Sequence, residues 1–185
     1  MEDRPTTQKN VSLFGLAYIA AIPVLAFALS FIPLKTNAAI NLPFLANAQT
    51  ERVLAFGGFP GCGSICPLSL STLQQTYIDY KSHITENDLS VVFLNIKLNS
   101  SPEITNQYAQ SFHQEFNGYS TIPADASALY KKLSLKTFSS EQDYSAHQGL
   151  IYLFEKIDQQ WRMTSVFDGN INQQDLLNYL LKKYS

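Results

Sequence analysis

Only two of the 185 residues are cysteines, Cys62 and Cys66. This scarcity excludes a disulfide-rich scaffold and a four-cysteine zinc site. Two cysteines four positions apart leave three possibilities: a redox pair, a metal-binding pair, or a coincidence of sequence. Methionine ligands are also lacking, because Met1 stands at the chain start and Met163 falls within a predicted strand.

Charge is the second thing this sequence lacks. Charged residues make up 15% of the chain, below the roughly 25% of an average soluble domain. The formal net charge of −2 excludes a broad nucleic-acid-binding surface, which needs a clear excess of Lys and Arg. Hydrophobic residues at 45% and aromatic residues at 12% argue for a packed core and against disorder. The length fits one domain plus an appendage.

Residues 11–34 contain no charged side chain. A helix of 24 residues spans about 36 Å, more than the roughly 30 Å hydrocarbon core of a bilayer. We therefore expect an uncleaved single-pass transmembrane anchor, preceded by a cytoplasmic N-terminus at residues 1–10. A cleaved signal peptide is the alternative, because Ala46-Asn47-Ala48 has the form of a cleavage site. However, signal-peptide cores run about 7–15 residues, and this one ends well before that site.

Basic residues set the expected orientation of the anchor. Arg4 and Lys9 precede the span, whereas Lys35 follows it closely. The bias toward positive charge on the inner side places the N-terminus inside and the remaining chain outside. We thus predict a bacterial inner-membrane protein with a periplasmic C-terminal domain. That compartment is oxidising, so a free thiol pair there must be kept reduced.

Strand and helix patterns alternate after an expected linker at residues 35–50. Apolar runs predict strands, and apolar residues three or four apart predict helices. The strands are expected at residues 52–59, 89–98, 149–156 and 161–167, and the helices at residues 67–83, 102–116, 124–133 and 172–183. A parallel βαβ unit followed by an antiparallel hairpin and a last helix is the order of the thioredoxin fold. We therefore predict an α/β domain at residues 51–185, with a central mixed sheet flanked by helices.

The cysteine pair falls between the first predicted strand and the first predicted helix. Backbone N–H groups at a helix N-terminus stabilise anions, so this place predicts a lowered thiol pKa. Pro67 suits the first helical position and disfavours helical geometry in the residue before it, so residues 61–66 are expected to be non-helical. Thiolates suit Cu(I) and zinc, and two sulfurs need one or two further ligands.

Three histidines are candidates for that further ligand. His83 is expected near the end of the first helix and His113 within the second, and neither is placed near the cysteine loop. His147 precedes the predicted hairpin, in the loop that faces the cysteines in thioredoxin-like folds. That loop usually carries a cis-proline, whereas this chain has no proline after Pro123. A solvated loop histidine is the alternative interpretation of His147.

The chain resembles the Sco/SenC family of membrane-tethered thioredoxin-fold proteins. The likeness covers roughly residues 52–182 and rests on three motifs in order: Phe56-Gly57 at the end of the first strand, Cys62-x-x-x-Cys66-Pro67, and His147 ahead of Ile151-Tyr152-Leu153. The resemblance implies a copper site made of Cys62, Cys66 and His147. It also implies a chaperone that delivers copper to subunit II of cytochrome c oxidase, or to another copper or thiol client protein.

The chain departs from the family pattern around the expected site. Gly63-Ser64-Ile65 stands between the cysteines where an acidic residue is common, and Ala146 stands where Asp is frequent before the histidine. The expected site thus lacks carboxylates that are common in the family, so the resemblance does not identify the client protein. Some family members instead act as thiol–disulfide oxidoreductases, and here Cys62 would attack and Cys66 would resolve. A static disulfide is the third hypothesis, so whether the protein is an enzyme stays undecided.

Overall fold

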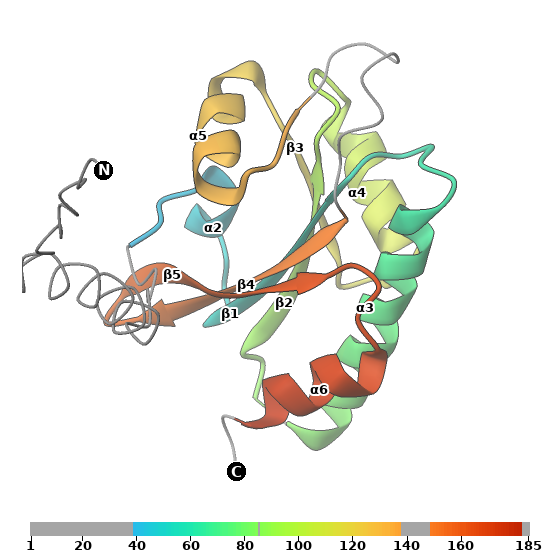
Figure 1. Ribbon diagram of the computed structural model, residues 1–185, viewed down its shortest axis with the longest axis vertical. Helices are drawn as coiled ribbons and strands as arrows, with labels where there is room; N and C mark the ends of the chain where they lie inside the picture. The colour runs from blue at the N-terminus through green and yellow to red at the C-terminus, as the bar shows by residue number, and fades with distance from the viewer. Residues whose placement is uncertain (1–38, 85, 138–148, 183–185) are drawn as a thin grey trace, which may run out of the picture. The chain divides into compact units, whose positions relative to one another are not determined.

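The computed structural model describes residues 39–84, 86–137 and 149–182 (Figure 1). The described part of the chain folds into α2 (Pro43–Ala46), β1 (Arg52–Gly58), α3 (Ile65–His83), β2 (Leu89–Asn95), α4 (Pro102–Gln110), β3 (Asn117–Ser120), α5 (Pro123–Leu133), β4 (Leu150–Ile157), β5 (Gln160–Asp168) and α6 (Gln173–Leu181). The predicted α/β class is confirmed.

The strands form one mixed sheet in the order β3-β2-β1-β4-β5. Strands β1, β2 and β3 run parallel, whereas β4 is antiparallel to β1 and β5 is antiparallel to β4. β1 pairs with β2 along its whole length, from Arg52↔Leu89 to Gly58↔Asn95. Because parallel strands end at the same edge of a sheet, the loops that follow Gly58 and Asn95 share one end of the domain.

The centre of the sheet is covered on both faces. Every residue of β1 is buried, as is every residue of β2 except Ser90. Figure 1 shows α3, α4 and α6 on one side of the sheet and α2 and α5 on the other. Phe93 packs on Tyr108 of α4 with ring centroids 5.0 Å apart, and Phe154 packs on Phe44 of α2 at 5.5 Å. Continuous apolar strands are expected where helices cover both faces.

The first and last predicted helices, α3 and α6, bury the apolar residues whose spacing predicted them. α3 buries Leu70, Leu73, Tyr77 and Tyr80. The Asn172 side chain accepts a hydrogen bond from the Gln174 N–H at 2.8 Å and caps α6, which buries Leu176, Leu177 and Leu180. α3 and α6 pack together, so the last helix is held against the helix that carries Cys66.

One predicted helix is shorter than expected, and one strand was not expected. The second helix was expected to reach residue 116, but α4 ends at Gln110. The chain turns there because Phe116 is buried in the core and Gly118 packs directly on the backbone of Thr105. Strand β3, at the sheet edge, was not predicted, because the four residues Asn-Gly-Tyr-Ser carry no apolar alternation.

The segment expected as a linker contributes to the packed domain. Leu42, Phe44 and Leu45 are buried in the hydrophobic core, and Ala39 bridges Arg162 of β5. Residues 39–50 therefore cross one face of the sheet instead of connecting two units loosely. No helix among the described residues has the length and hydropathy to cross a bilayer. The predicted anchor, residues 11–34, lies outside the described residues.

Candidate thiol site

Both cysteines lie at the carboxyl end of β1. The chain leaves the strand at Gly58 and turns through residues 59–64, where the Cys62 N–H donates to the Phe59 carbonyl at 3.2 Å. Gly61 has a φ of +98°, a conformation that glycine adopts at little cost and that this turn requires. Cys66 then stands in the first turn of α3. One strand and one helix thus hold the two sulfurs at the same end of the sheet.

The expectation of a non-helical loop through Cys66 is wrong in its boundary. α3 begins at Ile65, so both Ile65 and Cys66 are helical and Pro67 occupies the third helical position. The first four N–H groups of a helix have no partner within it, so the missing N–H of Pro67 costs nothing there. The thiol of Cys66 is consequently fixed by the helix, whereas Cys62 is carried by the turn.

The two thiols lie close together. Neither cysteine is in a disulfide; the side chains of Cys62 and Cys66 hydrogen-bond to each other. Cys62 is 7% exposed and Cys66 is fully buried. The Cys66 sulfur lies over Gly58, only 2.5 Å from where a Cβ of that residue would stand. Gly58 therefore makes the room in which the second thiol sits.

Burial raises the pKa of the Cys66 thiol to about 12, and the hydrogen bond to Cys62 adds to this rise. A hydrogen bond with the backbone of Phe59 opposes it. The predicted lowering of the thiol pKa is therefore wrong for Cys66, because desolvation outweighs stabilisation by the helix N-terminus. At neutral pH Cys66 holds its proton, so a metal ion or a bond-forming partner must displace it.

Tyr108 of α4 is a residue near the thiols that the sequence analysis did not single out. Its ring packs between Phe93 at 5.0 Å and Phe112 at 5.5 Å. Burial above all, and then the electrostatic effect of Cys66 and Cys62, raises the pKa of Tyr108 to about 12. A ring atom of Phe93 also lies 3.0 Å from the Cβ position over Gly58. The aromatic side chains of Phe93 and Tyr108 thus lie next to the cysteine pair.

Of the described histidines, His83 stands at the end of α3 as expected, whereas His113, expected within the second helix, lies in the turn after α4, which ends at Gln110. His83 ends α3 and its Nδ1 bonds to the Asp79 carbonyl at 2.8 Å. The His113 ring packs on Tyr77 at 5.1 Å and accepts the Glu115 N–H at Nδ1, away from the cysteines. His147 lies outside the described residues. Within the part of the chain that is described, no three His, Cys, Asp or Glu residues group to hold a metal ion.

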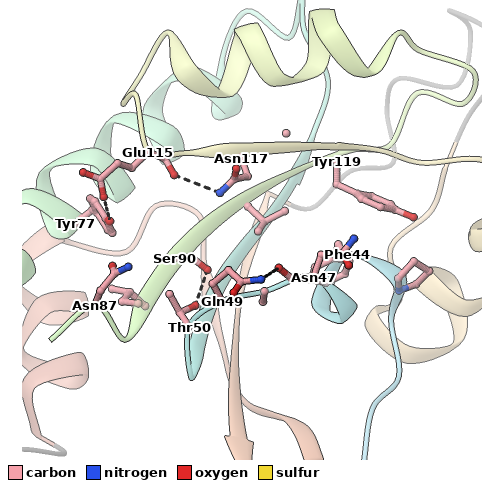
Figure 2. A pocket seen from close by; sticks show the side chains of 15 residues that line it. Phe44, Asn47, Gln49, Thr50, Tyr77, Asn87, Ser90, Glu115, Asn117 and Tyr119 are labelled. Atoms are coloured by element: carbon pink, nitrogen blue, oxygen red, sulfur yellow. Dashed lines mark hydrogen bonds between the residues drawn. The ribbon is translucent and has the colours of Figure 1, made fainter.

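A cavity of about 370 Å³ lies apart from the thiols, between the turn after α2 and the start of β3 (Figure 2). At its rim Tyr77 donates to Glu115 at 2.6 Å, and the Thr50 and Ser90 hydroxyls are 2.9 Å apart. Neither cysteine lines it. The cavity is therefore not part of the predicted site.

Comparison with known proteins links this geometry to a family. The sequence profile of the family described as SCO1/SenC matches residues 45–184, which spans α2 to α6. A search of curated proteins gives no match.

Several solved structures are similar in fold. Copper-bound ScoI of Arabidopsis thaliana superposes with a TM-score of 0.63 at 19% identity, covering 75% of this chain and 87% of its own. Copper-bound ScoI of Bradyrhizobium japonicum gives 0.56 at 22% identity, covering 73% and 85%. BsSco, titled as a cytochrome c oxidase assembly protein with a disulfide switch, gives 0.54 at 19%, covering 71% and 79%. At these identities the likeness shows the fold.

Proposed function

The chain belongs to the SCO1/SenC family, and we propose that it binds one copper ion through Cys62, Cys66 and His147 for delivery to a client protein. The observation that carries the proposal is that the Cys62 and Cys66 side chains form no disulfide and hydrogen-bond to each other, with Cys66 in the first turn of α3. Thiolates select soft ions such as Cu(I), and two thiols that can become such ligands stand together here.

The surroundings of the thiols fit a soft ion of low charge. No Asp, Glu, Lys, Arg or His occurs from Val53 to Ile78, the stretch that builds β1, the turn and the first turns of α3. Phe93 and Gly58 contact the space around the Cys66 sulfur. Hard divalent ions favour carboxylate ligands, and this stretch contains no carboxylate side chain.

Chain connectivity supports His147 as the third ligand. Gly149 packs on Ile65, the residue next to Cys66, since a Cβ on Gly149 would lie 2.5 Å from Ile65 Cγ1. His147 is two residues from Gly149, and two residues span at most about 7 Å. This short connection supports the proposal that His147 is the third ligand.

Copper titration tests the proposal. The reduced full chain, purified in detergent without oxygen, should take up one Cu(I) in competition with a chromophoric chelator. The His147→Ala variant should bind Cu(I) at least about tenfold more weakly, because it loses one of the three proposed ligands. His113→Ala is the matched control and should not change the affinity. An unchanged affinity in His147→Ala would remove the third ligand from the proposal.

Thiol–disulfide exchange is the second candidate, favoured by the unequal exposure of the two sulfurs. Cys62, the outer thiol, would attack a client disulfide and release one client thiolate. Cys66 would then attack the Cys62 sulfur and release the second, so the client gains two electrons and this pair becomes a disulfide. A pair that reduces a client peptide disulfide but binds no Cu(I) would favour this activity.

We further propose that residues 11–34 anchor the protein in a bacterial inner membrane with the thiol domain in the periplasm. The 24 uncharged residues and the basic flank at Arg4 and Lys9 support this placement. Family membership supports cytochrome c oxidase subunit II as the client. Protease added to spheroplasts should digest the thiol domain; protection until lysis would place it in the cytoplasm.

A further inference from the structure

Two glycines meet where the β4–β5 hairpin opens toward α3. Gly149 stands just before β4 and Gly169 just after β5, whose terminal residues pair as Leu150↔Asp168. A Cβ on Gly169 would collide with the Gly149 carbonyl and would lie 2.7 Å from the Ser69 hydroxyl. The backbones therefore touch at a distance that only glycine at position 169 permits.

Both glycines also contact the first turns of α3. Buried Ser69 donates a hydrogen bond to the Gly169 carbonyl at 2.9 Å. Gly149 has a φ of +53°, and a Cβ there would come within 2.5 Å of Ile65 Cγ1. Ile65 and Ser69 lie one helical turn apart and bracket Cys66. The base of the hairpin is thus docked on both sides of the cysteine-bearing turn.

We propose that Gly149 and Gly169 are positioning residues that set the distance between the thiol pair and the chain entering β4, and thereby the copper affinity. This inference rests on the proposed function, since the distance matters only if His147 joins the cysteines as a ligand. A binding constellation must be held within about 0.5 Å of its productive geometry. A methyl group at Gly149 would force Ile65 of α3 to shift, and one at Gly169 would force the Gly149 carbonyl and the Ser69 hydroxyl to shift, so either changes how the hairpin base sits on α3.

The test compares the two tightly packed glycines with an exposed position on α3. Gly149→Ala and Gly169→Ala in the full chain should weaken Cu(I) binding by about tenfold or more, the range seen when a ligand's supporting contacts are lost. Ser71→Ala is the control, because Ser71 is an exposed residue of α3 outside the cysteine loop. It should leave the affinity unchanged. Circular dichroism establishes that each variant is folded, and a count of two thiols after denaturation establishes that the pair is reduced.

Two further variants separate positioning from a general loss of structure. In the His147→Ala background, Gly149→Ala should cause no further loss of affinity, because it acts through the absent histidine. Adding Ile65→Ala to Gly149→Ala removes the clashing Cγ1 atom and should restore most of the affinity. Additive losses in the double variant, or no rescue by Ile65→Ala, would overturn the inference.

Failure of the proposed function gives a different result. If the parent chain binds no Cu(I), or if His147→Ala has no effect, the copper site itself is wrong. If His147→Ala weakens binding while Gly149→Ala and Gly169→Ala do not, the copper site stands and only the positioning role is refuted.

Discussion

The two ends of strand β1 bury opposite kinds of chemistry. At the amino end Arg52, 1% exposed, brings a full charge into the core. At the carboxyl end Gly58 leaves space for the uncharged Cys66 thiol. The strand thus begins in a charged network and ends beside the turn and the helix that carry the two cysteines.

The amino end ties polar groups to one another. Arg52 Nη1 donates to the Tyr80 hydroxyl at 3.2 Å and to the Leu180 carbonyl at 3.1 Å, and Nε lies 3.1 Å from Glu155 Oε1. The Tyr80 hydroxyl in turn donates to Asp88 at 2.8 Å. This network joins β1, α3, α6 and β4. These groups stabilise the fold, since each contacts another group of the same domain.

The carboxyl end of β1 leads to two reactive thiols, and no charged residue occurs in the chain from Val53 to Ile78 that carries them. The thiols hydrogen-bond to each other, and burial keeps the proton on Cys66. Such a buried thiol remains available for a ligand that can displace its proton. The comparison separates a buried charged network, which is structural, from a buried cysteine pair, which is the candidate functional site.

Removing the charge at the amino end should produce the largest effect. Arg52→Met should lower the free energy of unfolding by about 3–5 kcal/mol, because Glu155 is left without its buried partner. Urea denaturation measures the change. Copper affinity of the folded fraction should not change, because the network lies at the other end of β1.

The control for Arg52 is the more exposed ion pair beside it. Lys156 Nζ and Glu51 Oε1 are 3.9 Å apart, and the Glu51 side chain is 57% exposed. Glu51→Gln should alter stability by no more than about 0.5 kcal/mol. A loss below 1 kcal/mol in Arg52→Met, comparable to this control, would show that the buried network is not what holds the amino end.

Filling the carboxyl end should have an intermediate effect on stability and a large one on binding. Gly58→Ala places a Cβ 2.5 Å from the Cys66 sulfur and 3.0 Å from the Phe93 ring. Overpacking of this kind costs about 1–3 kcal/mol. Displacement of Cys66 should also weaken copper binding, measured by chelator competition. Normal affinity in a stably folded Gly58→Ala variant would contradict the placement of Cys66 in the site.

The smallest predicted effect is a pH dependence caused by Cys66. Burial raises the pKa of its thiol from 9.0 to about 12. Below pH 9 both folded and unfolded chains keep the proton, so the contribution of the neutral thiol is complete. As pH rises from 9 to 12 the unfolded chain loses the proton first, and the free energy of unfolding falls.

Urea midpoints of the reduced protein at pH 8 and pH 10 should show this fall, and Cys66→Ala should reduce it. Buried tyrosines, whose pKa values are also raised, add to the loss mainly above pH 10. If the urea midpoint of Cys66→Ala has the same pH dependence, burial does not raise the pKa of the Cys66 thiol.

Most of the fold could be predicted because its central elements have strong apolar patterns. The strands around Phe56, Phe93 and Leu153 and the helices with Leu73 and Leu177 stand where periodicity placed them. Edge strand β3 and helix α2 could not be predicted, because their short sequences gain their structure from tertiary contacts. Gly118 against Thr105 and Phe44 against Phe154 are examples of such contacts.

The site could be predicted in its residue types but not in its electrostatics. The spacing of Cys62 and Cys66 and their place before a helix follow from the sequence. The full burial of Cys66 depends on how Gly58 packs, and the approach of Tyr108 depends on how α4 crosses β2. Neither has a local sequence signal. The role of His147 stays a prediction.

X-ray absorption at the copper edge, on the copper-loaded full chain, tests the central claim most directly. The spectrum should contain two sulfur donors and one nitrogen donor on each copper, and His147→Ala should remove the nitrogen while keeping both sulfurs. A first shell of only oxygen and nitrogen, or one that is unchanged in His147→Ala, would contradict the proposed copper site.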